Sequence, residues 1–194
     1  MTNDPSSVQA SPVLAAVDPV FTPLDGAGFQ RLFRAEFRYV WTSLRRLGVP
    51  PRDIEDVAHE MFLEVHRQLV RYDPRRPARP WLFAFALRFA ADYRKQARVR
   101  REGFGEAPEM LDPSPGADAR VAEREARDIV AEALEAVELE RRAVFILFEL
   151  DEVPMADIAT SLGLPVNTAY SRLRLARDEF AAAARRIQLR RGGR

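Results

Sequence analysis

The chain has 194 residues, of which 47% are hydrophobic and 30% charged, with a net charge of +1 and no cysteine. This composition predicts a globular protein of one or two small domains, and the missing cysteine excludes disulfides and thiolate chemistry. No apolar run approaches the roughly 20 residues that span a membrane, and the N-terminus lacks a signal-peptide pattern. We therefore expect a cytoplasmic protein without membrane insertion.

Charge is segregated along the sequence. Residues 71–101 hold ten basic and two acidic side chains, residues 102–140 hold three and twelve, and residues 141–194 hold ten and six. Two basic blocks separated by an acidic one predict two surfaces that face a polyanion, joined by a segment that does not.

The first part of the chain divides into an extension and a helix. Residues 1–27 contain four prolines among scattered Ser, Asp and Ala, without a helical period, and predict a disordered N-terminal extension. Apolar residues then recur at helical spacing over residues 28–47, and a glycine followed by two prolines is expected to end that helix.

A second helix is predicted from Asp53, which can cap its start, to about Leu69. Its buried stripe is expected to consist of Ile54, Val57, Ala58, Met61, Val65 and Leu69. The opposite face is acidic on balance. Leu63 lies near that polar face, where an apolar side chain indicates either a partner surface or a broad buried stripe.

The next segment, RYDPRRPARP at residues 71–80, combines four arginines with three prolines. A stiffened loop loses less entropy when it grips a ligand, so this composition favours binding over simple connection. A third helix is expected from Trp81 to about Arg100, with basic side chains beside aromatic ones. That mixture suits single-stranded DNA, because bases stack on rings while arginines hold phosphates, although core packing explains most of the aromatic residues.

Residues 102–120 are rich in Gly, Pro and Glu and predict an acidic linker. Helical spacing resumes at Val121, and a further helix is expected over residues 141–150. The segment 154–186 then has the pattern of a helix-turn-helix, with Gly163 as the stop between a short helix and a longer basic one. The second helix could enter a major groove, and the alternative is a helical hairpin with a solvated basic face.

The order of these parts resembles the sigma factors of bacterial RNA polymerase, and more narrowly the two-domain extracytoplasmic-function (ECF) group of the sigma-70 family. The resemblance rests on the stretches DIEDVAHEMFLEVHRQLVRYD, RPWLFAFALRFAADYRKQARVRR and RRAVFILFELDEVPMADIATSLGLPVNTAYSRLRLAR. It implies an all-α fold of two small helical domains on a flexible linker. These would be sigma domain two at residues 28–101 and sigma domain four at residues 121–186, followed by a basic tail at residues 187–194.

The resemblance also implies three sets of contact residues. Core polymerase, chiefly the clamp of its beta-prime subunit but also beta, would contact Asp56, His59, Glu60 and Leu63. The −10 element, opened to single strands, would contact Arg75, Arg76, Arg79, Arg88, Asp92, Lys95 and Arg98. The −35 element, as duplex, would contact Thr168, Tyr170, Ser171, Arg172, Arg174 and Arg177. His59 departs from the family pattern at a polymerase contact, where glutamine is usual, so that one hydrogen bond does not carry over. The Ala169–Tyr170 pair departs from it on the DNA-reading helix, so the promoter sequence does not carry over.

The implied activity is promoter-specific transcription initiation without catalysis, a metal, a cofactor or a small-molecule substrate. An anti-sigma factor is an implied partner, and the polymerase-bound form would lie on the nucleoid. A stand-alone helix-turn-helix regulator is the alternative, but it leaves the acidic helix and the arginine loop without a role. A metal-dependent nuclease would need the acids around His59, but Leu63 stands where a zinc helix needs its second histidine.

Overall fold

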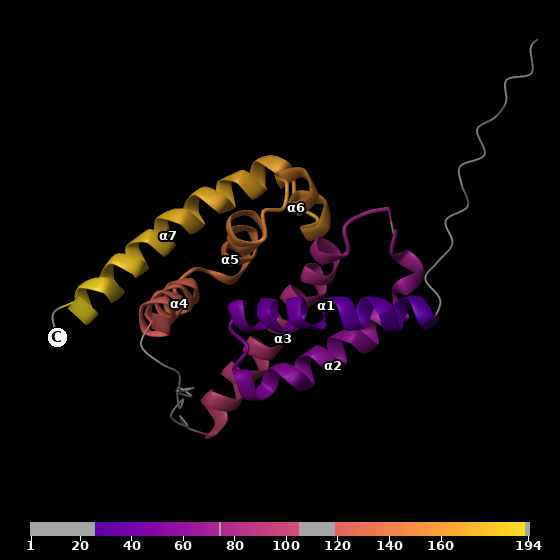
Figure 1. Cartoon of the computed structure of the whole chain (residues 1–194), viewed down its shortest axis with the longest axis horizontal. Helices are drawn as coiled ribbons and strands as arrows, with labels where there is room; N and C mark the ends of the chain where they lie inside the picture. The colour runs from indigo at the N-terminus through magenta and orange to yellow at the C-terminus, as the bar shows by residue number, and fades with distance from the viewer. Residues whose placement is uncertain (1–25, 74, 105–118, 193–194) are drawn as a thin grey trace, which may run out of the picture.

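The computed structural model describes residues 26–73, 75–104 and 119–192, and all regular elements in these ranges are helices (Figure 1). They are α1 (Gly26–Arg46), α2 (Pro51–Arg67), η1 (Leu69–Arg71), α3 (Ala78–Phe104), α4 (Ala119–Glu135), α5 (Leu139–Phe145), η2 (Ile146–Leu150), α6 (Met155–Leu162) and α7 (Val166–Gly192). The predicted all-α fold is confirmed. Residues 1–25 of the predicted N-terminal extension and most of the predicted linker lie outside the described residues, whereas Gly26 and Ala27 already belong to α1.

The turn between α1 and α2 is set by glycine and proline. Gly48 has φ 95°, a left-handed conformation that glycine adopts without steric cost. Pro51 then occupies the first position of α2, where its missing N–H would have no helical partner. The predicted cap by Asp53 is wrong, because the prolines already fix this helix start. The Asp53 carboxylate lies in the first turn and accepts a 2.5 Å hydrogen bond from the Tyr93 hydroxyl.

All six residues of the predicted stripe are buried, although α2 ends at Arg67 and Leu69 belongs to η1, and Phe62, which the prediction omitted, is buried beside them. The buried side chains of α2 pack between α1 and α3, whose own buried residues include Leu44, Leu82 and Phe83. Helix α3 begins at Ala78, three residues earlier than expected, so Arg79 belongs to its first turn. The α1–α3 group therefore holds the arginine-rich segment at one end of a packed bundle.

The second group of helices, α4–α7, contains the helix-turn-helix. Gly163 ends α6 in the left-handed conformation, with φ 64°, as a C-terminal glycine stop should. Helix α7 follows directly after Pro165 and continues to Gly192, beyond the predicted end at Arg186. The helix expected over residues 141–150 is interrupted, because its second half winds as the π-helical segment η2.

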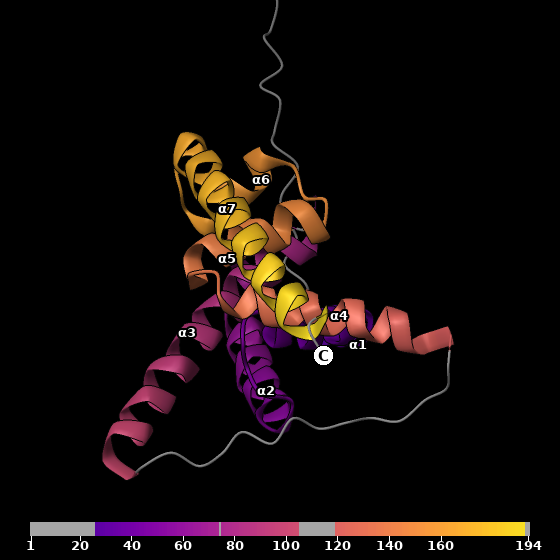
Figure 2. The ribbon, with the colours of Figure 1, turned by 90° about the vertical axis from the view of Figure 1, so that its left-hand side faces the viewer.

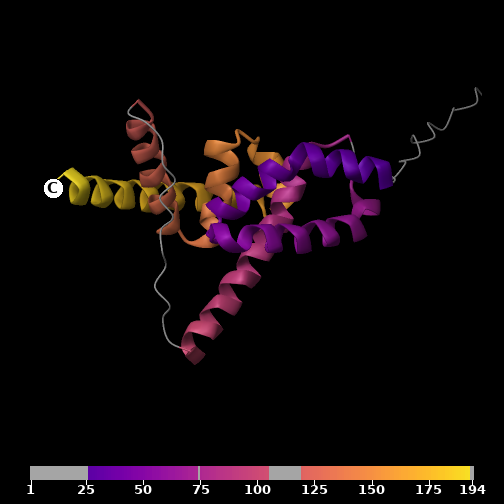
Figure 3. The same cartoon turned by 60° about the horizontal axis from the view of Figure 1, so that its bottom comes forward.

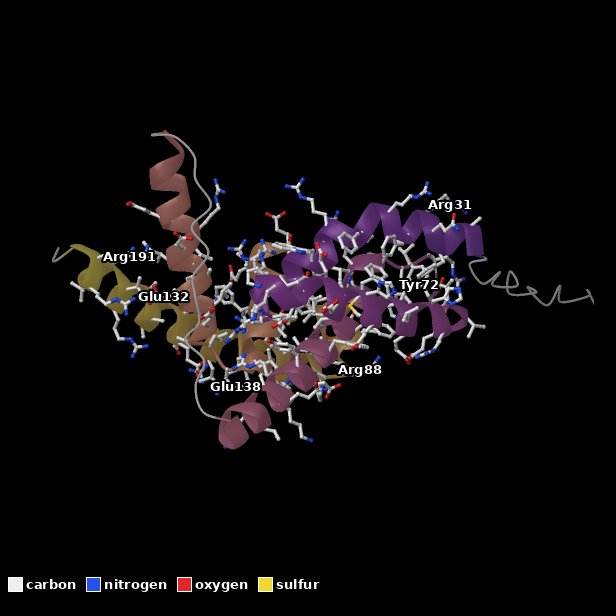
Figure 4. All side chains as sticks on the ribbon, turned by 90° about the horizontal axis from the view of Figure 1, so that it is seen from below. Arg31, Tyr72, Arg88, Glu132, Glu138 and Arg191 are labelled. Atoms are coloured by element: carbon white, nitrogen blue, oxygen red, sulfur yellow. The ribbon has the colours of Figure 1, made fainter. Side chains whose placement is uncertain are left out.

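Helix α7 packs along most of its length (Figure 2). Its N-terminal half buries Ala169, Leu173 and Ala176, and its C-terminal half buries Ala183 and Ile187 against Ala133 of α4. Glu132 of α4 is ion-paired with both Arg190 and Arg191 near the end of α7 (Figure 4). Both halves of this long helix are thereby fixed to the same domain.

The two groups of helices pack on each other. Helix α6 lies beside the N-terminal part of α3, and α1 contacts α4 (Figures 1 and 3). One continuous cluster of buried apolar residues includes side chains from both groups, such as Leu82 of α3 and Ile158 of α6. The sequence predicted the two domains but not this contact between them.

Candidate polymerase- and DNA-binding surfaces

The predicted polymerase-contact residues lie together on the exposed face of α2. Asp56, His59 and Glu60 are exposed, and Leu63 is 50% exposed one turn further along. Successive positions three and four apart share one face of a helix, so these four side chains form one acidic surface with an apolar centre. The same helical spacing that puts the buried residues of α2 on one face puts these four residues together on the opposite, exposed face.

A groove of about 420 Å³ opens beside Leu63, between α2 and the start of α1. It is lined by Phe29, Gln30, Phe33, Arg34, His59, Phe62 and Leu63. The Phe33 ring remains 36% exposed and meets the Phe62 ring edge-on, with centroids 4.7 Å apart. Sequence reasoning missed this groove, because the helical spacing of Phe29 and Phe33 does not show whether their side chains are covered.

The arginine-rich segment is organised by two aromatic residues. The Tyr72 and Trp81 ring centroids lie 4.7 Å apart, and the Tyr72 hydroxyl donates a 2.9 Å hydrogen bond to the carbonyl oxygen of Arg76. Arg75 folds back onto Asp73, with 3.0 Å between Nε and Oδ1, and these hydrogen bonds lower the pKa of the Asp73 carboxyl. The segment therefore has a defined shape before any ligand arrives.

Arg79 is held by α1. Its Nε donates a 3.0 Å hydrogen bond to Oε2 of Glu36, and its guanidinium carbon lies 5.1 Å from the centre of the Tyr39 ring. A guanidinium at this distance from a ring is attracted by the electrons of its face. Of the three predicted loop arginines, Arg79 is thus the one that is positioned by a neighbouring helix.

The predicted DNA-contact residues of α3 are all exposed and follow one another along the helix: Arg88, Asp92, Lys95 and Arg98. The Arg88 guanidinium carbon lies 4.9 Å from the Phe85 ring centre and 5.8 Å from that of Phe89 (Arg88 is labelled in Figure 4). The phenylalanines support the base of this surface, with Phe85 itself buried. The structure assigns them to packing, which was the interpretation favoured for most aromatic residues of this helix.

The six predicted residues of α7 are divided by their position around the helix. Ser171 and Arg174 are exposed on the far side from the buried stripe and Tyr170 is exposed beside it, while Thr168 and Arg172 are half-buried. At 100° per residue, Arg172 and Arg177 fall on the two edges of the buried stripe. Arg172 is ion-paired with Glu140 of α5, and Arg177 donates from Nε to Oε1 of Glu149 at 2.7 Å. These two ion pairs hold Arg172 and Arg177 in place on either side of the exposed face of α7.

Neither a metal centre nor a membrane span is found. Among the residues described, no three His, Cys, Asp or Glu side chains lie close enough together to hold a metal ion. None of the helices in those same ranges is both long enough and apolar enough to cross a bilayer.

Two family models match the chain. The model of sigma-70 region 2 matches residues 32–100, and that of sigma-70 region 4 matches residues 127–180. The RNA polymerase sigma factor CnrH of Cupriavidus metallidurans is 30% identical over 148 residues, covering 72% of this chain and 78% of CnrH. The ECF RNA polymerase sigma factor SigL of Mycobacterium tuberculosis is 30% identical over 167 residues, covering 85% of this chain and 90% of SigL.

Two solved structures have a similar fold. The structure of CnrH in complex with the cytosolic domain of CnrY has a TM-score of 0.58 and 25% identity, over 81% of this chain and 88% of that one. The sigma factor RpoE in complex with the anti-sigma factor NepR from Bartonella quintana has a TM-score of 0.65 and 18% identity, over 81% and 96%. With both regions matched in order and relatives aligned over most of their length, the chain belongs to the sigma-70 family of RNA polymerase sigma factors, in its ECF group.

Proposed function

We propose that this sigma factor recruits core polymerase through α2, holds duplex promoter DNA with α7, and captures an opened strand with the arginine loop and α3. One observation carries this assignment. A single chain presents an acidic and apolar docking face on one helix, and separate basic surfaces on both of its domains. A stand-alone DNA-binding regulator has no use for the first of these surfaces, and the match to sigma-70 region 2 disfavours that alternative.

Docking on polymerase would combine charge with burial. Asp56 and Glu60 would meet basic side chains of the beta-prime clamp, which speeds encounter and fixes register. Leu63 and the exposed edge of Phe33 would supply the apolar centre, because hot spots at interfaces are residues that become fully desolvated. The groove beside them gives a partner side chain a place to insert.

Strand capture would rest on Arg75, Arg76 and Arg79. Flipping a base out of the stack costs a few kcal/mol, which a pre-shaped pocket and phosphate contacts must offset. The Tyr72–Trp81 contact supports a pre-shaped loop. Further along α3, the exposed Arg88, Lys95 and Arg98 would hold phosphates of the same strand, with Asp92 among them.

Reading of the −35 element would fall to the exposed centre of α7. Tyr170, Ser171 and Arg174 would contact base edges in the major groove. Thr168, Arg172 and Arg177 would contact phosphates, which position the helix without carrying sequence information. For Arg172 and Arg177 this requires that a phosphate compete with Glu140 and Glu149 for the guanidinium group.

An anti-sigma factor is the remaining proposed partner. The two solved structures named above are complexes, one with the anti-sigma factor NepR and one with the cytosolic domain of CnrY. An inhibitor of this kind would act on a non-enzymatic initiation factor by covering its polymerase or DNA surfaces. The expected location of this encounter is the cytoplasm, at the nucleoid when polymerase is bound.

The test is a reconstituted transcription assay with core polymerase and genomic fragments. The wild-type chain should produce discrete transcripts, and the double variant Asp56→Arg/Glu60→Arg should lose both polymerase binding and transcription. Reversal of two exposed acids on α4, Glu125→Arg/Asp128→Arg, is the matched control for net charge. If the first pair of reversals leaves core binding and transcription unchanged, the docking assignment is wrong.

A further inference from the structure

The outer face of α1 carries a row of arginines that none of the surfaces described above includes. Four of its arginines are exposed: Arg31, Arg34, Arg38 and Arg45. At 100° per residue they fall within about 60° of one another, on the side of α1 opposite its buried residues. The row is about 21 Å long at a rise of 1.5 Å per residue. These four side chains form the α1 arginine row.

The α1 arginine row has no acidic partner among the described residues. In those ranges, none of its four guanidinium groups forms an ion pair with a carboxylate. The one acidic residue of α1, Glu36, lies almost opposite the row around the helix and is bonded to Arg79.

Many arginines elsewhere are ion-paired, including Arg67, Arg75, Arg141, Arg172, Arg177 and Arg190. An arginine-rich composition alone gives no reason for pairs on so many other surfaces and for none on the outer face of α1. The α1 arginine row is therefore a local concentration of positive charge, which attracts a polyanion.

The side chains around the row disfavour several kinds of anionic partner. Ala35 and Thr42, which lie between the arginines, are small, and the apolar side of α1 is buried in the core. A helix that lies on a membrane needs an exposed apolar face, and a protein interface needs apolar or aromatic anchors. Trp41 is half-buried, with the guanidinium carbon of Arg45 5.9 Å from its ring centre, so little ring surface is open to an unpaired base.

The backbone of duplex DNA matches the row in charge and in shape. Each strand of a duplex carries one phosphate about every 3.4 Å along the axis, so a row of about 21 Å spans about six phosphates. The planar guanidinium group donates two parallel hydrogen bonds to a phosphate. The small side chains of Ala35 and Thr42 leave room for the backbone of the duplex to approach the helix.

We propose that the α1 arginine row is a further DNA-binding site, which holds the phosphate backbone of a duplex without reading its sequence. In the view of Figure 4, Arg31 and Arg88 lie at opposite edges of the α1–α3 group, so this site is separate from the surface of α3. Duplex binding by the row does not depend on the proposed function. Its use in initiation does: the row would hold duplex DNA on one side of domain two while the arginine loop and α3 hold an opened strand.

The test is a fluorescence anisotropy titration of the full chain, without polymerase, on a labelled duplex of mixed sequence. The wild-type chain should bind with a Kd of about 1–100 μM, the usual range for sequence-independent binding. In Arg31→Gln/Arg34→Gln/Arg38→Gln/Arg45→Gln, the slope of log affinity against log salt should fall by up to about 3.6, or about 0.9 for each of four phosphate contacts. The affinity should fall at least about tenfold at about 0.1 M salt.

Two variants separate contact by the row from an effect of net charge or folding. Arg52→Gln/Arg67→Gln/Arg127→Gln/Arg191→Gln removes the same charge at four exposed positions outside α1, and should change the salt slope by less than about 0.9. Lysine at the four positions of the row keeps the charge and should keep the slope. Arginine, glutamine and lysine have similar helix propensities, so circular dichroism should show the same helix content in every variant.

The position of the duplex is tested with a DNA-cleaving reagent on a single cysteine, since the chain has none of its own. Ala35→Cys, within the row, should direct cuts into the bound duplex, and Ala126→Cys on α4 should not. The proposal is overturned if the glutamine variant keeps its salt slope, if the charge control loses as much, or if Ala35→Cys gives no cuts.

Single-stranded DNA and vesicles containing phosphatidylserine are the competing ligands. A glutamine variant that loses either of these while it binds the duplex as the wild type does would also overturn the proposal. Failure of the chain to support transcription, with duplex binding by the row intact, would count only against the proposed function.

Discussion

The half-exposed Leu63 allows a quantitative test of the polymerase-docking surface. Full burial of a leucine side chain is worth about 1.5–3 kcal/mol. Because Leu63 is 50% exposed in the free chain, roughly half of that burial remains to be gained when a partner covers it. Leu63→Ala should therefore weaken binding to core polymerase by about 1 kcal/mol, a factor of about five in Kd.

The same substitution should leave the fold nearly unchanged, since exposed substitutions usually alter stability by less than about 0.5 kcal/mol. The assay is a fluorescence titration of labelled chain with core enzyme, together with urea unfolding of the same samples. Leu189→Ala is the matched control, because Leu189 is 78% exposed near the end of α7. Equal Kd values for Leu63→Ala and wild type, or a similar loss in Leu189→Ala, would refute the reasoning.

Three further predictions concern the DNA surfaces and the buried Arg142. The triple variant Arg75→Ala/Arg76→Ala/Arg79→Ala should bind core polymerase normally but lose promoter opening, measured by permanganate reactivity of unpaired thymines; loss of core binding would contradict the assignment. Arg177→Ala should lower the slope of log affinity against log salt on duplex promoter DNA by up to about 0.9, the value for one phosphate contact, and an unchanged slope would remove Arg177 from the set of phosphate contacts. Arg142→Met should destabilise the chain by about 2–4 kcal/mol in urea, because two carbonyl oxygens lose their donors, while Arg141→Met, at a more exposed ion pair, should cost less than about 1 kcal/mol.

The elements that the sequence predicted well are those determined by neighbours three or four residues away. The buried stripe of α2 and the glycine stop at Gly163 depend on local spacing and on a left-handed backbone, and both are found where they were expected. The exposed face of α2 follows from the same period. The start of α2 was misjudged because Asp53 was weighed as a cap without regard to the two prolines before it.

The features that sequence reasoning missed depend on residues far apart in the chain. The Tyr39 hydroxyl donates a 2.9 Å hydrogen bond to Asp151, 112 positions along the chain, and nothing in either local pattern indicates that they meet. The groove beside Leu63 has the same origin, because a phenylalanine on an apolar face is exposed or buried according to what packs above it. The acidic partners of Arg172 and Arg177 likewise belong to other helices, so these ion pairs could not be predicted from the sequence of α7 alone.

The length of α7 has a mechanical consequence. It is one unbroken helix of 27 residues, about 40 Å long, with the proposed promoter contacts at one end and the Glu132 ion pairs at the other. Helix α4, to which that far end is tied, is also the first element after the connecting segment between the domains. A displacement of α4 is therefore expected to change the tilt of α7 and, with it, the orientation of the proposed promoter contacts at its other end.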